Sequence, residues 1–80
     1  MAGAKAQAIV GLMETRNEGV SEQNPNFKAG VRAMKSAEQA EKAGDYDQAQ
    51  TLYRSANSKF ETAISVHQMS SRMAENEELQ

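Results

Sequence analysis

Apolar and polar positions recur with a helical period along most of the chain, and this pattern predicts three helices. Over residues 3–16, good helix formers dominate and apolar side chains return every three or four positions, at Ala6, Ile9, Val10 and Met13. Leu12 widens the same face. Such spacing is typical of a helix with one buried side. We therefore expect a first helix over residues 3–16 that packs through this face on the rest of the protein.

The start of a second helix is marked by the dipeptide Asn24-Pro25. Residues 17–24 before it are polar and have no period, which predicts a loop. An Asn side chain caps exposed backbone N–H groups well, and Pro is favoured at the first helical position. We expect a helix over residues 25–43, whose apolar stripe begins with large side chains and ends with small ones: Phe27, Val31, Ala33, Met34, Ala37 and Ala40.

A tight turn at Gly44 should separate this helix from the next. Glycine adopts the left-handed conformation that ends a helix, and Asp45 follows as a cap with Gln48 three residues later. A connection this short forces its two helices to run antiparallel. The sequence therefore predicts a helical hairpin around Gly44.

The third helix should be long, over residues 46–75, with an acidic and frayed end. Its core stripe comprises Ala49, Tyr53, Ala56, Phe60, Ala63 and Ile64, and a second line beside it comprises Leu52, Lys59, Val66 and Met73, with Met69 nearby. Residues 65–71 are weaker helix formers, which leaves open a break and a short fourth helix, although continuation is favoured. The apolar surface is wider than one antiparallel neighbour can cover.

These elements predict an all-α fold, a single small three-helix bundle over residues 1–80 built on the hairpin at Gly44. The chain contains thirteen alanines and eighteen larger apolar residues, so its core is thin and lined by small side chains. A domain of this size buries too little surface for high stability on its own. Partner binding or self-association would supplement it.

Charge and composition narrow the classes of function. The chain has no cysteine, which excludes disulfides and thiolate metal sites, and its nine basic and eleven acidic residues are spread along its length. That distribution does not indicate a nucleic-acid interface, which requires clustered cations. The longest apolar run is far shorter than the ~20 residues that span a bilayer. We expect a cytoplasmic protein with no membrane insertion.

Candidate catalytic and metal-binding residues lack the partners that such chemistry needs. His67 is the single histidine, and no acidic residue lies three or four positions away from it. Asp45 and Asp47 are explained by helix capping, and no loop with calcium-binding spacing follows them. No glycine-rich phosphate loop occurs. We therefore expect no enzymatic activity, no cofactor and no metal.

The segment from Ala43 to Ala56, AGDYDQAQTLYRSA, followed by Phe60, Ala63 and Ile64, resembles the helical hairpin of MIT (microtubule-interacting and transport) domains. It also resembles a tetratricopeptide hairpin. The resemblance covers residues 31–65. In an MIT domain a third helix follows the hairpin, whereas this chain instead has an extra helix in front of it. The MIT resemblance implies binding of short C-terminal helical motifs of membrane-remodelling proteins.

Two functional hypotheses remain open. In the first, the chain is a protein-binding module that presents an apolar groove along its third helix to a helical partner segment. In the second, it is a structural subunit, and the same surface joins copies of the chain, as in a secretion-apparatus filament. For either case the expected contact residues are Leu52, Lys59, Val66, Met69 and Met73.

Overall fold

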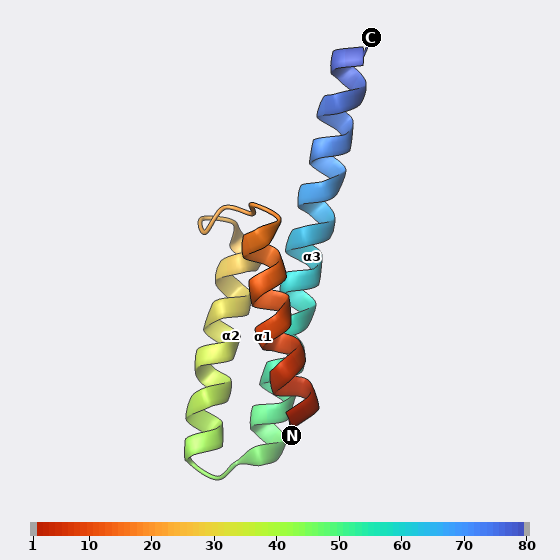
Figure 1. Ribbon diagram of the computed structural model, residues 1–80. Coiled ribbons are helices and arrows are strands. Elements are labelled where there is room, and N and C mark those ends of the chain that lie inside the picture. Colours follow the sequence, from red (N-terminus) through yellow and green to blue (C-terminus); the bar gives the residue numbers. More distant parts are fainter. Residues whose placement is uncertain (1, 80) are drawn as a thin grey trace.

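The computed structural model describes residues 2–79, with the side chains of residues 3–73. It contains helices α1 (Ala2–Asn17), α2 (Pro25–Lys42) and α3 (Tyr46–Leu79), packed into a rod of 56 × 21 × 16 Å (Figure 1). No strand occurs among the described residues. The expected all-α three-helix bundle is therefore confirmed.

The ends of α2 follow the local rules that predict them. The Asn24 side chain accepts hydrogen bonds from the backbone N–H groups of Asn26 (2.9 Å) and Phe27 (3.2 Å). At the other end, Gly44 has a φ of 84°, and the Asp45 N–H donates back to the Ala40 carbonyl at 2.9 Å. The Asp45 carboxylate then accepts from the first turn of α3. These bonds reverse the chain and set α2 and α3 antiparallel.

Helix α3 is continuous through residues 65–71 and runs to Leu79, four residues beyond the expected end. Ala63 is its last fully buried residue, and the described side chains from Gln68 to Met73 are all exposed. Figure 1 shows this part of α3 standing clear of the two shorter helices. We call residues 68–79 the α3 extension.

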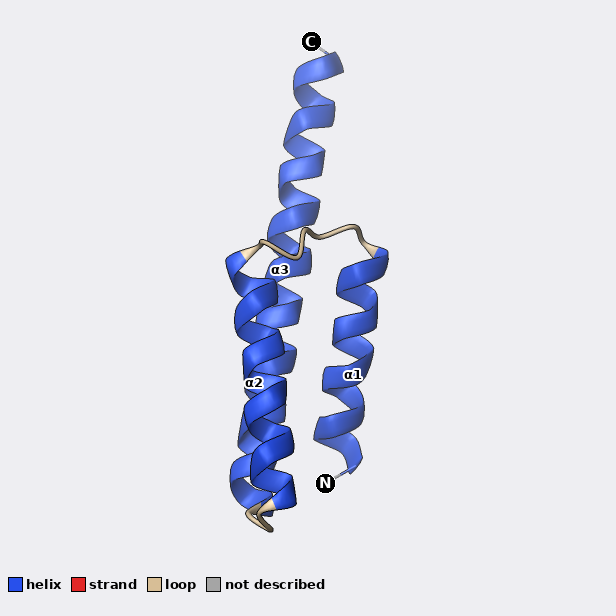
Figure 2. Ribbon diagram, turned by 90° about the vertical axis from the view of Figure 1, so that its left-hand side faces the viewer, coloured by secondary structure: helices blue, strands red, loops and turns tan. Residues whose placement is uncertain are grey.

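Helices α1 and α2 both pack on α3 and touch each other at few points, as the gap between their ribbons in Figure 2 illustrates. The main core consists of Ala4, Ala8, Met34, Ala37, Ala49, Tyr53, Ala56 and Phe60. At the loop end, Val20 joins Phe27 and Ala63 in a second cluster. The central helix of the bundle is thus α3.

Phe60 occupies the point where the three helices meet. Its ring lies against Gly30 of α2, where an added Cβ would be 2.5 Å from Cε1 and 2.8 Å from Cδ1. On the α1 side, a Cβ at Gly11 would be 3.4 Å from the Phe60 Cβ and 2.8 Å from the Asn57 Oδ1. Phe27 meets the same ring edge-on, with centroids 6.0 Å apart. The two glycines therefore make room for one aromatic ring.

The buried face of α1 differs from the expected one. Of the residues expected to pack inward, Leu12 is half-buried against the core, but Ala6 is exposed, and Ile9, Val10 and Met13 are 41%, 51% and 57% exposed. The prediction was wrong because the size of a side chain was taken as the sign of burial. The face against α3 is instead made of small or half-buried residues that allow close approach: Ala4, Ala8, Gly11, Leu12 and Thr15.

A polar contact closes the other end of the bundle. The Lys5 Nζ donates to the Glu41 Oε1 at 2.9 Å, linking α1 to α2. That hydrogen bond and the carboxylate charge raise the pKa of Lys5. Nearby, Tyr53 is fully buried and its hydroxyl has no hydrogen-bond partner among the described residues. Burial, followed by the negative charge of Glu41, raises the pKa of Tyr53 above its ordinary value of 10.0.

Replacing Gly30 by Ala should destabilise the bundle, because the new methyl group would overlap the Phe60 ring. Overpacking of this kind costs about 1–3 kcal/mol, which exceeds the gain of roughly 1 kcal/mol from better helix propensity. Urea unfolding would measure the change. The matched control is Gly3→Ala, where a Cβ meets nothing within 4 Å. Equal stabilisation by both substitutions would show that Phe60 does not constrain the packing.

Replacing Tyr53 by Phe should leave stability at pH 7 unchanged or raise it by up to about 1 kcal/mol, because an unpartnered buried hydroxyl is removed. The pKa of Tyr53 is raised in the folded state, so the folded protein holds this proton more tightly than the unfolded chain does. The free energy of unfolding of the wild type is therefore unaffected by this group below pH 10 and falls as the pH rises further. Thermal unfolding at pH 9 and pH 11 should show a smaller loss for Tyr53→Phe. Equal losses would place the Tyr53 hydroxyl in contact with water.

Candidate protein-binding surfaces

The five residues expected to form one contact line lie in two different settings. Leu52 is half-buried and packs against the main core, so it supports the bundle. Lys59 is exposed on the part of α3 that lies within the bundle. Val66, Met69 and Met73 are 47%, 62% and 64% exposed, at the level where α3 leaves the other helices and beyond it. The structure thus brings together three of the five residues as an exposed apolar surface.

We call Val66, Met69 and Met73 the α3 seam. Their spacing of three and then four residues places them on one side of the helix, as the a and d positions of a coiled coil do. Within the bundle, Ala56, Phe60 and Ala63 are buried on the inner side of α3. At about 3.6 residues per turn, the α3 seam lies on a different side of the helix from these residues. The seam therefore faces outward, where another helix can reach it.

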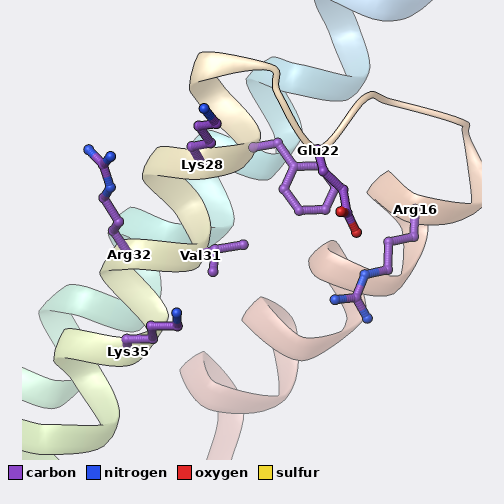
Figure 3. Close-up of a pocket in the computed structure, with 7 residues that line it drawn as sticks. Arg16, Glu22, Lys28, Val31, Arg32 and Lys35 are labelled. Carbon is purple, nitrogen blue, oxygen red and sulfur yellow. The ribbon is translucent and has the colours of Figure 1, made fainter.

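A second surface, not expected from the sequence, lies between α1 and α2 near the connecting loop. Four cations surround a pocket of about 330 Å³ there: Arg16, Lys28, Arg32 and Lys35. Phe27 and Val31 form its apolar floor, and Glu22 contributes one carboxylate to its rim. In Figure 3, Arg16 reaches into the gap from α1 and Lys35 from α2. We call this surface the basic groove.

The fold explains why these cations gather. Lys28, Arg32 and Lys35 follow one another at intervals of four and three residues, which places them along one side of α2. Arg16 lies in the last turn of α1, and the antiparallel course of the two helices brings it opposite. The ion pair found among the described residues, between Lys5 and Glu41, involves none of the four.

The basic groove was not expected, because its cations are spread along the sequence. The spacing of the three cations on α2 was a visible signal, but the contribution of Arg16 becomes apparent only once α1 is placed beside α2. The groove is therefore a product of tertiary structure.

His67 is half-buried on α3, and no group of three or more potential metal ligands occurs in the described part of the chain. None of the described helices combines the length and the hydropathy needed to cross a membrane.

No protein-family model, curated protein or solved structure matches the chain.

Proposed function

We propose that this protein is a protein–protein interaction module that binds a helical segment of another protein along the α3 seam. The observation that carries the proposal is the exposure of Val66, Met69 and Met73 on one side of a helix that continues past its own bundle. An amphipathic helix that lays its apolar face on such a surface is a recurrent mode of recognition. The partner that the MIT resemblance implies is a helical motif of a membrane-remodelling protein.

The size of the seam favours a transient contact. Burying a Val or Met side chain fully contributes about 1.5–3 kcal/mol, and these three are already partly covered by their own helix. Together they provide a few kcal/mol before the cost of association is subtracted. Binding of this strength suits a module that exchanges partners. Lys59 precedes the α3 seam on the same helix, and contacts at this residue would extend the interface toward the bundle.

A second candidate function, a structural subunit that assembles with copies of itself, is favoured by the coiled-coil spacing of the seam. If the seams of two copies packed together, Val66, Met69 and Met73 of both copies would be buried. In this case the occupant of the seam is another copy of the chain, as in a helical filament.

A photo-crosslinking amino acid at Met69 should capture the partner in cells, because this side chain lies in the middle of the seam. The matched control carries the same group at Gln68, which is also exposed but points to another side of α3. Mass spectrometry of the product would identify the partner. Val66→Asp should reduce crosslinking at least tenfold with unchanged thermal unfolding, because Val66 is half-exposed.

The outcome also separates the two candidates. Products that contain another protein support the module, and products that contain this chain alone support the structural subunit. Equal crosslinking from Met69 and Gln68 would rule out the seam as a binding surface. Unfolding of the Val66→Asp variant would show that Val66 belongs to the core.

A further inference from the structure

Acidic charge is concentrated at the end of the chain that stands clear of the bundle. Residues 66–80 contain one cation, Arg72, and three acids, Glu75, Glu77 and Glu78, which together account for the net charge of −2 of the whole chain. Residues 1–65 are therefore balanced overall. Within this balanced part, four cations and one carboxylate line the basic groove. The two regions have complementary charge.

The basic groove also has an apolar border that a helix could cover. On α1, Ile9 and Met13 precede Arg16 by seven and three residues, so the helical period places them on the same side of α1 as Arg16. Both are exposed. A helical segment lying between α1 and α2 would cover these side chains and the pocket floor at Phe27 and Val31.

The α3 extension has the length and side-chain pattern to fit this groove. Its twelve residues span about 18 Å, whereas the stretch of α2 from Lys28 to Lys35 spans about 11 Å. The side of α3 that faces α1 and α2 in the bundle continues past it with half-buried His67 and the small residues Ser70 and Ser71. Small side chains allow close helix approach, and the acidic residues follow them in the sequence.

We propose that the basic groove binds the α3 extension of a second copy of this chain, and that the exchange is reciprocal. The second α3 would run antiparallel to the first, so a two-fold axis relates the copies and each extension lies in the other copy's groove. Each half of the dimer then has four helices, and the acidic end of one chain lies beside the cations of the other. The α3 seam stays on the outer side, so this inference is independent of the proposed function.

The structure favours a helix over a membrane as the occupant. Arg16 and Lys35 reach into a hollow between two helices, which a rod can fill, whereas a bilayer presents a flat surface. A helix in the groove would also cover the apolar residues left exposed on α1. The contact would be sensitive to salt, because ionic screening acts over about 8 Å at physiological ionic strength.

A charge-exchange experiment with the full chain tests the proposal by sedimentation velocity over a concentration series at low salt. The wild type should form a dimer. A groove variant, Lys28→Glu with Lys35→Glu, and a tail variant, Glu75→Lys with Glu77→Lys and Glu78→Lys, should each dimerise at least tenfold more weakly. An equimolar mixture of the two should form a 1:1 dimer, because both contacts regain opposite charges in the mixed pair.

The matched control reverses two exposed cations outside the groove, Lys42→Glu with Arg54→Glu, and should dimerise as the wild type does. Circular dichroism of each variant checks that the helices are retained. The variant Val66→Asp separates this contact from the proposed function, since it should lose partner crosslinking and keep the dimer. Loss of the dimer in Val66→Asp but not in the groove variant would instead assign self-association to the seam.

Three results would overturn the proposal: a wild type that stays monomeric throughout the series, groove and tail variants that dimerise like the control, or a mixture of the two variants that remains monomeric. A monomeric wild type that binds vesicles containing phosphatidylserine, with loss of binding in the groove variant, would assign the groove to a membrane surface.

Raising the salt concentration should dissociate the wild-type dimer, and an unchanged dimer at high salt would also contradict the charge pairing.

Discussion

The ring of Phe60, packed against Gly11 and Gly30, determines how the three helices are arranged. Because neither glycine has a side chain, α1 and α2 can each approach α3 closely at the same level of the bundle. Both helices are thereby drawn onto α3 and make few contacts with each other. Glycine inside a helix costs roughly 1 kcal/mol relative to alanine, and here that cost is offset by the close packing of a large buried ring. The basic groove exists because the gap between α1 and α2 is left open on the side away from α3.

The same constraint explains the exposed apolar residues of α1. A helix that meets its neighbour through glycine and alanine has to turn its small residues inward, and its larger ones then fall on the remaining sides. Ile9, Val10 and Met13 are exposed for this reason. Apolar residues on the surface of a small monomer that lie beside a charged groove are typical of an interface. Their exposure is thus a consequence of how the core is packed.

The sequence was informative where local physics decides the structure and uninformative where tertiary contacts decide it. The Asn24 cap and the Gly44 turn depend on neighbouring residues alone, so α2, α3 and their antiparallel packing could be predicted. The buried face of α1 could not, because Gly11 gains its role only from Phe60, which lies 49 positions away in the chain. The α3 seam was partly predicted from its periodicity, although Leu52 proved to support the core. The basic groove required the positions of two helices and was missed.

Helix α3 has 34 residues, whereas α1 and α2 have 16 and 18, so the end of α3 continues past both of its neighbours (Figure 1). Most helices in proteins are stabilised by tertiary packing of one face, whereas residues 68–73 of the α3 extension are all exposed. Its acidic residues lie at a helix C-terminus, where the helix dipole disfavours negative charge. A partner that covers the seam, or a cationic surface that neutralises the acids, would therefore stabilise the extension as well as bind it. Of the elements of this fold, the extension is the one whose stability depends most directly on what it contacts.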